Sequence, residues 1–367
     1  MTETPKPPAE LRGAIIGYGF ISERGHLPAY ALPGATRFEI VAVADVCPAR
    51  RDRAHRDLPN ARIYKSHVEL LEAEHGRIDF VDVSTPPSEH ARIALAALSR
   101  GLHVLCEKPL ATSAEDARAM LAHARETRRV LFPCHNYKHA PVIKAVRQIL
   151  DVGLIGSVQL VTLQTFRNTH ARGVDEWRRD WRREGRFSGG GIAMDHGSHT
   201  FYLAFDWLGS FPTAITAKMT TLGDFDTEDN FACSMTFPNG MATAHLSWTA
   251  GFRRVIYTIH GDKGAIRVED DDVEVAIMNG DGAEGHVKWE MQRERVASEW
   301  MDASHVGWFR SMFQQFAEAV GREELVSNET EASARCVELI TTAYASARDA
   351  SRERSIVQVS PAALRRQ

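Results

Sequence analysis

A lysine directly follows an apolar run and precedes a proline in the segment Cys106-Glu107-Lys108-Pro109. The run "HVLC" is typical of a buried strand, so the two charged residues mark the point where that strand ends. Proline has no N–H to donate and a fixed φ, which stops the strand at Pro109. Open α/β sheets bind ligands outside the carboxyl ends of their strands. Lys108 is therefore a candidate for ligand contact.

A second candidate group lies in "MDHGSH", where Asp195 and His199 are four residues apart. On a helix this spacing places both side chains on one face. Histidine is a natural proton acceptor near neutral pH, and a neighbouring cation stabilises a developing alkoxide. These residue types suit proton transfer to or from a substrate hydroxyl. A metal bound by Asp195, His196 and His199 is the weaker interpretation because no third separate segment offers a ligand, so we expect no metal.

A glycine turn near the N-terminus predicts a dinucleotide site. The segment "GAIIGYGFISERGH" contains Gly17-x-Gly19-x-x-Ser22 after an apolar strand, and a helix is expected to follow. Gly17 permits a tight turn, Gly19 lets the backbone approach a pyrophosphate, and Ser22 is small enough for helix–strand packing. The N–H groups at the helix N-terminus then face the phosphates. We expect Phe20 and Ile21, within this turn, to contact the cofactor.

Asp45 ends the next apolar run, 26 residues after Gly19. A carboxylate at this position binds the adenosine ribose hydroxyls and repels a 2′-phosphate, which favours NAD over NADP. Arg50 and Arg51 lie just beyond and are able to offset that repulsion, so NADP stays open.

Short apolar runs alternate with helical patterns in the first part of the chain. Strands are expected within 13–19, 38–45, 78–85, 103–108 and 130–136, with helices at 48–56, 67–75, 90–100 and 113–127. This alternation predicts a parallel sheet with right-handed crossovers.

After about residue 150 strands follow one another directly. They are expected at 157–167, 213–221, 230–237, 241–249, 255–261, 265–270 and 273–278, with helices at 192–208, 306–320 and 330–350. "FPNGM" predicts a hairpin in which Asn239-Gly240 suits a turn with positive φ.

The fold class we predict is therefore α/β, with two domains. Residues 1–134 form an N-terminal Rossmann NAD(P)-binding domain, with 1–11 as a loose tail. Residues 135–367 form a C-terminal α+β domain for substrate binding and oligomerisation, built on a large, mostly antiparallel open sheet. Its last helices pack on that sheet or back on the first domain. The apolar residues of its strands predict a homodimer or homotetramer through the open face.

Composition excludes several other classes of protein. The chain has 367 residues, 44% hydrophobic and 25% charged, and a net charge of −4, which does not indicate binding to nucleic acid or to a membrane surface. No apolar run approaches the roughly 20 residues that span a bilayer. The N-terminus is not typical of a signal peptide. Five scattered cysteines without a C-x-x-C pair predict neither structural zinc nor a disulfide framework, and fit the cytoplasm.

With these motifs, the sequence resembles the glucose–fructose oxidoreductase / inositol dehydrogenase (Gfo/Idh/MocA) family over nearly the whole chain. Four segments carry the resemblance: 17–30, 84–111 (with the E-K-P motif), 135–150 and 189–209 (with D-x-x-x-H). The resemblance implies a Rossmann domain, a second domain on an open sheet, and NAD(P)-dependent redox chemistry on sugars or cyclitols. The loop from Gly19 to His26 is one residue longer than the common family pattern, which leaves the role of His26 open.

The resemblance also implies roles for individual residues. Lys108 enters the active site, and Asp195 and His199 face it from the second domain. Besides the glycine turn and Asp45, the implied cofactor contacts are Ser84, Thr85, Pro86, the nearby His90, Glu107 and Lys108.

The segment 167–191 is rich in arginine and contains two tryptophans. Its arginines either bind an anionic substrate group, such as a phosphate or carboxylate, or form a solvated or oligomer-contacting loop. Its tryptophans either pack against a sugar ring or anchor the loop. Weaker candidates for substrate binding are Tyr137, Lys138, Arg167, His170, Trp181 and Arg182.

The leading hypothesis is hydride transfer between NAD(P) and a secondary alcohol or ketone of a sugar or cyclitol, anionic ones included. His199 acts as base or acid, Lys108 polarises the oxygen, and Asp195 holds the substrate or orients His199. One alternative is an enzyme that keeps and recycles bound NAD, as in glycoside cleavage or epimerisation. Another is a non-catalytic NAD(P) or sugar sensor.

Overall fold

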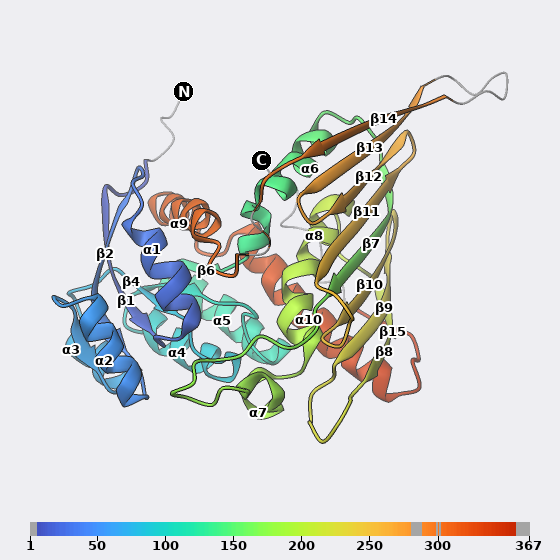
Figure 1. The fold of residues 1–367 in the computed structure, drawn as a ribbon. Helices are drawn as coiled ribbons and strands as arrows, with labels where there is room; N and C mark the ends of the chain where they lie inside the picture. The colour runs from blue at the N-terminus through green and yellow to red at the C-terminus, as the bar shows by residue number, and fades with distance from the viewer. Residues whose placement is uncertain (1–5, 280–287, 299, 301, 357–367) are drawn as a thin grey trace. The chain divides into compact units, whose positions relative to one another are not determined.

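The computed structural model describes residues 6–279, 288–298, 300 and 302–356 (Figure 1). The chain forms two compact units. The first unit contains residues up to 136, together with 171–190 and 303–337, and the second contains 137–170, 191–302 and the residues from 338 on. The chain thus enters the second unit beside the domain boundary expected at residue 134, and returns to the first unit twice.

A six-stranded parallel sheet forms the centre of the first unit, in the order β3-β2-β1-β4-β5-β6. Its strands are β1 (Glu10–Ile16), β2 (Arg37–Ala44), β3 (Arg62–Tyr64), β4 (Phe80–Val83), β5 (His103–Cys106) and β6 (Leu131–Pro133). This order confirms the predicted Rossmann fold, although the short β3 was not expected. Because β1 pairs with both β2 and β4, the winding of the sheet reverses there, and dinucleotides bind at such a point.

Two hydrophobic clusters cover the two faces of this sheet. Leu70, Leu98 and Met120 belong to one, and Phe38 and Phe313 belong to the other. The helices concerned are α1 (Leu27–Ala31), α2 (Pro48–Asp57), α3 (His67–Ala73), α4 (His90–Leu98), α5 (Ala114–Thr127) and α9 (Val306–Gly321). The helix α9 comes from far along the chain and buries an i, i+3, i+4, i+7 stripe from residue 309 to 316, which is why it packs on the second face.

The second unit contains a nine-stranded sheet in the order β14-β13-β12-β11-β7-β10-β9-β8-β15. Its strands are β7 (Val158–Phe166), β8 (Ala214–Thr220), β9 (Asn230–Phe237), β10 (Gly240–Ser247), β11 (Arg254–Gly261), β12 (Gly264–Glu269), β13 (Asp272–Asn279), β14 (Lys288–Arg295) and β15 (Arg354–Ser355). Only β7 and β10 pair in parallel, so the predicted mostly antiparallel sheet is confirmed. The strands β14 and β15 were not predicted.

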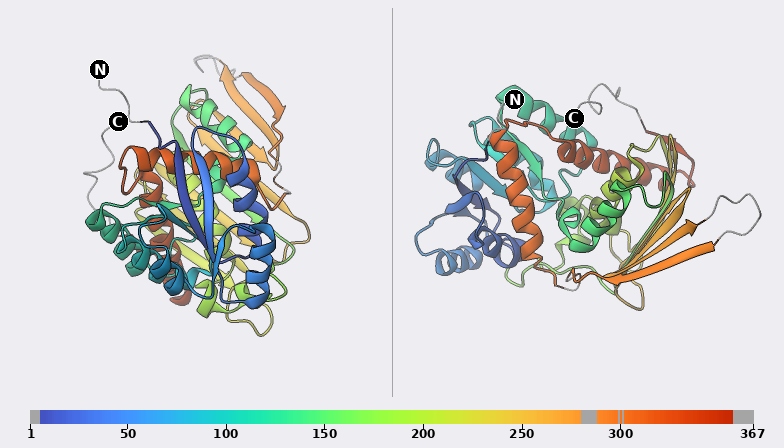
Figure 2. Two further views of the ribbon diagram at one scale, coloured as in Figure 1. Left: turned by 90° about the vertical axis from the view of Figure 1, so that its left-hand side faces the viewer. Right: turned by 90° about the horizontal axis from the view of Figure 1, so that it is seen from above.

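Helices cover one face of the nine-stranded sheet and leave the other open (Figure 2). The covering helices are α6 (Pro141–Asp151), which was not among the expected helices, α8 (Ser198–Leu208) and the second half of α10 (Asn328–Arg348). Along β9, Phe231, Cys233 and Met235 are buried, whereas Ala232 and Ser234 alternate with them toward the open face. This period of two is the expected pattern for a sheet covered on one side.

The predicted hairpin joins β9 to β10, but its turn differs from the prediction. Phe237 pairs with Gly240, so Pro238 and Asn239 form the turn, and neither Asn239 nor Gly240 is among the positive-φ residues of the described chain. Proline favours the first turn position through its fixed negative φ. Glycine is required at 240 for another reason: a Cβ there would lie 2.0 Å from the carbonyl oxygen of Gln159.

Across the described ranges, no helix is long and apolar enough to cross a membrane. The five cysteines are all buried and form no disulfide.

Candidate active site

The glycine turn after β1 has the geometry of a dinucleotide cradle. Gly17 has a φ of +94°, and a Cβ there would lie 2.8 Å from the carbonyl oxygen of Ser84, so only glycine fits. At Gly19 a Cβ would meet nothing within 4 Å, which leaves the open space that a pyrophosphate needs beside the backbone. The hydroxyl of Thr85, in the adjacent loop, is buried without a hydrogen-bond partner among the described residues. This combination fits NAD.

The residues after this turn form an unusual π-helical turn, Ser22–His26. The Ser22 hydroxyl is buried and donates to the carbonyl of Gly17 at 2.6 Å, while Phe20 stays half-exposed and Ile21 precedes the turn. A π turn holds one more residue than an α-helical turn. A loop one residue longer than the family pattern, as expected between Gly19 and His26, would fit such a turn.

Asp45, directly after β2, faces the same turn. Its two carboxylate oxygens accept hydrogen bonds from the backbone N–H groups of Tyr18 (2.7 Å) and Cys47 (2.7 Å). Burial raises the pKa of Asp45, and these backbone donors act against that rise. The carboxylate is thus fixed where the ribose-binding acid was expected, with lone pairs left for hydroxyl donors.

The arginines beyond Asp45 bind other groups. The buried Arg50 donates to the carbonyl of Tyr18 at 2.7 Å and to the carboxylate of Glu23. Arg51 donates to the carbonyls of Asp45 and of the residue after it. These guanidinium groups are engaged within the unit, which favours NAD over NADP.

We expect Asp45→Ala to raise the ratio of NADP to NAD efficiency by about tenfold or more, since a like-charge contact costs several kcal/mol. Steady-state kinetics with each nucleotide measures this ratio. Asp52→Ala removes the same charge at an exposed position in α2 and should leave the ratio unchanged. An unaltered ratio in Asp45→Ala would contradict this role for the carboxylate.

Lys108 lies just beyond the carboxyl end of β5, and two buried side chains hold the backbone around it. Its N–H donates to Glu107 Oε2 at 3.0 Å, and the Lys108–Pro109 peptide bond is cis. The ring nitrogens of His90 lie 2.8 Å from the carbonyl oxygens of Pro109 and Thr85. Through these two contacts His90 connects this turn to the loop containing Ser84, Thr85 and Pro86. His90 is fully buried, which lowers its pKa.

Asp195 and His199 lie together in the second unit, at the start of α8. Asp195 belongs to a π-helical turn, Ala193–Gly197, and its carboxylate lies 3.3 Å from Nδ1 of the adjacent His196. The His199 ring stacks on Tyr137, with centroids 4.1 Å apart, and Tyr137 meets Trp300 edge-on at 4.8 Å. These contacts fix the plane of the imidazole and make Tyr137 part of the same group.

A buried glutamate, which the sequence analysis did not single out, holds the start of this segment. Glu228 accepts hydrogen bonds from the N–H groups of Gly191 (2.7 Å) and Ala193 (2.9 Å) and from the Tyr344 hydroxyl (2.8 Å). Burial raises its pKa. A Cβ at residue 191 would lie 1.9 Å from the Glu228 carbonyl oxygen, so the glycine triplet before Asp195 includes one glycine that this packing requires.

The weaker substrate candidates are divided between the two units. In the second unit, Lys138 lies 3.8 Å from the Asp206 carboxylate, Arg167 is buried and donates to a neighbouring carbonyl, and the ring of His170 lies 5.8 Å from that of Trp248. Trp181 and Arg182 belong to the first unit, where the guanidinium lies over the indole at 4.2 Å.

The arginine-rich segment 171–190 folds onto the first unit and contains many of its own counter-charges. Arg178 and Arg186 both contact Glu184, and Arg179 contacts Asp175. A backbone carbonyl of the segment accepts from Cys47, at the start of α2. Much of its positive charge is therefore paired locally, which favours the interpretation as a structural loop.

Among the residues described, only His26, Glu107 and Cys134 bring three possible metal-ligand atoms together. Burial raises the pKa of the Cys134 thiol well above its usual value, which keeps it protonated and a poor ligand. The group of Asp195, His196 and His199 does not form such a cluster in the described chain.

Known proteins resemble the chain along most of its length. Residues 11–135 match the model of the oxidoreductase family with an NAD-binding Rossmann fold, and residues 143–267 match the GFO/IDH/MocA C-terminal domain. Inositol 2-dehydrogenase of Rhizobium meliloti (strain 1021) is 30% identical over 283 residues, which cover 74% of this chain and 80% of that protein. The 1,5-anhydro-D-fructose reductase of Ensifer adhaerens is 32% identical over 193 residues, 52% of this chain and 56% of that protein.

A solved structure of levoglucosan dehydrogenase with NADH shares the fold, with a TM-score of 0.81 at 20% identity over 95% of this chain and 100% of that one. The glycine turn and the hydrogen-bonded Asp45 agree with the matched models on NAD as the cofactor. The class of reaction, an oxidoreduction, comes from the matched models and relatives. The chain is an NAD-dependent oxidoreductase and belongs to the Gfo/Idh/MocA family.

Proposed function

We propose that the enzyme transfers a hydride between NAD and a secondary alcohol or ketone, a CH–OH centre, of a sugar or cyclitol. The observation that carries this proposal is the extended similarity to an inositol 2-dehydrogenase, combined with a lysine at the carboxyl end of β5. That edge of a Rossmann sheet is where ligands bind. The names of further relatives, which include a levoglucosan dehydrogenase, support a polyhydroxylated ring as the substrate class.

The first unit would hold the cofactor. We assign Gly17, Gly19, Phe20, Ile21 and Ser22 to the pyrophosphate turn and Asp45 to the ribose. Ser84, Thr85, Pro86, Glu107 and Lys108 complete the set, and His90 contributes by fixing the two loops. Bound NAD supplies the hydride acceptor in the oxidation direction.

Three side chains of the enzyme would handle the substrate hydroxyl. Lys108 donates a hydrogen bond to the reacting oxygen and stabilises the negative charge that develops there. His199 removes the proton; we assign this to Nε2, because Nδ1 is buried. Asp195 holds a neighbouring hydroxyl of the ring or orients His199. Tyr137, stacked on His199, keeps the imidazole plane fixed during the proton transfer.

We also propose that the substrates include sugars or cyclitols that carry a phosphate or a carboxylate. Of the arginines in segment 167–191, Arg178, Arg179 and Arg186 contact acidic side chains of that same segment. Arg167 and Arg182, which each donate to a backbone carbonyl, are the side chains that we would test for binding of a phosphate or carboxylate.

An absorbance screen for NADH formation tests the function. The panel should contain cyclitols, aldoses, anhydrosugars and glycosides, each with phosphorylated or carboxylated forms where these exist. We expect NADH to accumulate with at least one uncharged cyclitol or sugar. Absence of NADH with every alcohol, together with NAD that stays bound through purification, would favour the recycling enzyme. Absence of all turnover despite tight NAD binding would favour the sensor.

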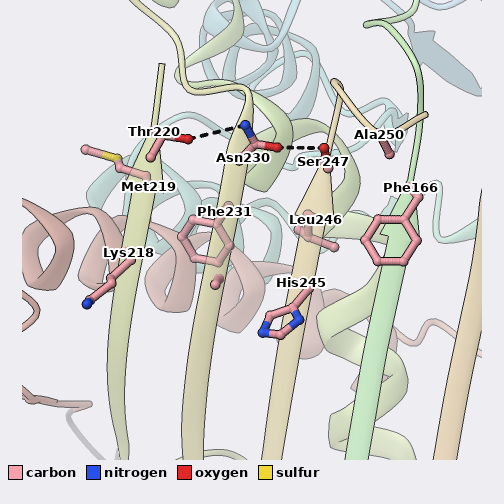
Figure 3. Close-up of a pocket in the computed structure, with 11 residues that line it drawn as sticks. Phe166, Lys218, Met219, Thr220, Asn230, Phe231, His245, Leu246, Ser247 and Ala250 are labelled. Carbon is pink, nitrogen blue, oxygen red and sulfur yellow. Dashed lines mark hydrogen bonds between the residues drawn. The ribbon is translucent and has the colours of Figure 1, made fainter. Parts of the chain in front are cut away.

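We further propose that residues 1–134 bind the cofactor, that residues 135–367 bind the substrate and oligomerise, and that the enzyme works in the cytoplasm. The open face of the nine-stranded sheet supports the oligomer. It has a shallow hollow lined by residues of β7 to β10, among them Phe166, Lys218 and His245 (Figure 3). On the same sheet Leu160 and Met241 are exposed at 37% and 41%.

We expect light scattering at micromolar concentration to show a dimer or tetramer. Ala232→Arg places a long charged side chain in the middle of the open face and should dissociate the oligomer into monomers. Val152→Arg makes a similar change at a position that is 77% exposed after α6, and should leave the assembly intact. A monomeric wild-type chain would contradict the proposed interface.

A further inference from the structure

A buried histidine lies between two carboxylates in the first unit. His26 is fully buried, with Nδ1 2.7 Å from Asp82 Oδ2 and Nε2 3.1 Å from Glu107 Oε1. Asp82 also accepts hydrogen bonds from the hydroxyls of Tyr30 (2.8 Å) and Ser84 (2.8 Å). The three ionisable groups come from the π turn, from β4 and from the end of β5, so the contacts tie together three segments of the cofactor domain.

If both carboxyl groups are ionised, these distances need an N–H donor on each nitrogen of the ring. A neutral imidazole has a single N–H, so one of the two carboxylates would face a nitrogen lone pair. An imidazolium donates to both carboxylates and compensates part of their buried charge. Burial alone would lower the pKa of His26, but Asp82 and Glu107 outweigh it and raise that pKa to about 10.

The other described neighbours of the ring are uncharged, and they include the Ser84 hydroxyl, 3.4 Å from Nδ1. Phe309 and Phe313 of α9 meet it edge-on, with centroids 4.4 Å and 5.3 Å away. Cys134 lies beside Glu107, and burial holds the pKa of its thiol well above the usual value, so it adds no charge. A metal bound by His26, Glu107 and Cys134 would need a ring nitrogen that already contacts a carboxylate.

The contacts continue from the histidine to the lysine of the E-K-P motif. One oxygen of Glu107 contacts His26, and the other accepts the backbone N–H of Lys108. These two contacts fix the orientation of the Glu107 carboxylate, and the second one also fixes the backbone of Lys108. Loss of the donor at His26 would leave Glu107 held by the Lys108 N–H and the Cys134 thiol, without its contact to the imidazole. Asp82 would keep the hydroxyls of Tyr30 and Ser84 but lose its cationic partner.

We infer that His26 is a positioning residue that, as a buried imidazolium, orients Glu107 and through it the backbone of Lys108 for hydride transfer. This inference rests on the proposed function of Lys108. His26, whose role the longer loop left open, would thus position the catalytic lysine. The π turn Ser22–His26 places its imidazole ring between the two carboxylates.

Ring NMR of the wild-type enzyme tests the charge directly. With isotope-labelled histidine, one of the 16 histidines should keep the chemical shifts of an imidazolium at about pH 9, where unperturbed rings are neutral. That signal should be absent from His26→Gln. A spectrum in which every histidine is neutral at about pH 9 would overturn the inference, and this experiment does not depend on the variant folding.

Kinetics of His26→Gln tests the positioning. We expect kcat to fall by about tenfold to a hundredfold, while KM for NAD changes less than about threefold, because misplacement of the reacting groups affects the chemical step. His103→Gln makes the same substitution at the amino end of β5 and should leave kcat unchanged. An unchanged kcat in His26→Gln would overturn the role, as would an equal loss in NAD binding and turnover.

Thermal unfolding against pH gives an independent check. The pKa of His26 in the folded chain, about 10, is above its ordinary value of 6.5. Its contribution to stability is therefore fully present below about pH 6.5 and is lost as pH rises through about 10. Over that window the melting temperature of wild type should fall more than that of His26→Gln, and parallel curves would contradict the imidazolium.

The two proposals fail in different ways. If Lys108→Ala abolishes turnover but His26→Gln does not alter kcat, the proposed function stands and the positioning role is wrong. If no sugar or cyclitol is oxidised by wild type, the proposed function fails. The NMR and unfolding experiments still decide whether His26 carries a buried charge.

Discussion

Lys108→Ala is expected to lower kcat for alcohol oxidation by about a thousandfold, the size of effect found when a group that stabilises a developing oxyanion is removed. The backbone around residue 108 is held by Glu107 and by His90, which contacts the next carbonyl, so truncation of the side chain should leave the turn folded. NADH binding, measured by fluorescence titration, should stay within about threefold of wild type because the glycine turn and Asp45 are untouched.

Two further variants sharpen this test. Lys108→Arg keeps the charge but replaces a compact ammonium with a planar fork, so most of the activity should still be lost. Lys65→Ala removes an exposed lysine of the same unit and should have no effect. If Lys108→Ala turns over at a rate near wild type, this lysine is not the group that polarises the substrate oxygen.

The second large effect is expected at His199. His199→Gln should lower kcat by about a hundredfold to ten-thousandfold, because general acid–base catalysis contributes on that scale. The pH–rate profile of the residual activity should lose its acidic limb, since hydroxide or water then takes the proton. Glutamine preserves much of the packing against Tyr137, so the fold should survive.

The matched control is His75→Gln, an exposed histidine of the first unit, for which no change in kcat or pH profile is expected. A His199→Gln enzyme with an unaltered pH profile would show that another group accepts the proton. Asp195, which contacts His196 in this structure, would then be the next residue to test.

Much of the fold is predictable from local patterns of apolar and polar residues in the sequence. The apolar run before Lys108 and the alternation along β9 are visible without a structure, and both elements form where those patterns place them. The strand β14 escapes prediction because all of its described side chains are exposed, so no periodicity marks it. Its position follows from antiparallel pairing with β13, which is a tertiary effect.

The contacts among the residues that support the site could not be predicted, for a related reason. His26, Asp82 and Glu107 lie up to 81 positions apart, and only the finished sheet brings them into contact. Glu228 lies 37 residues from the glycine that it holds. The sequence shows a reactive residue by its type and its place at the end of a strand, whereas a buried partner looks like any other charged residue until the fold is known.

Transfer of deuterium from the substrate to NAD distinguishes net oxidation of the substrate from internal recycling of a bound cofactor. The enzyme is given a cyclitol or sugar found by the screen, deuterated at the carbon that is oxidised, with excess NAD, and the nucleotide is analysed by mass spectrometry. We expect free NADH carrying one deuterium, formed in equal amount to the ketone, and neither product with Lys108→Ala. Deuterium retained in an epimerised or cleaved sugar, with no reduced nucleotide released, would contradict this expectation.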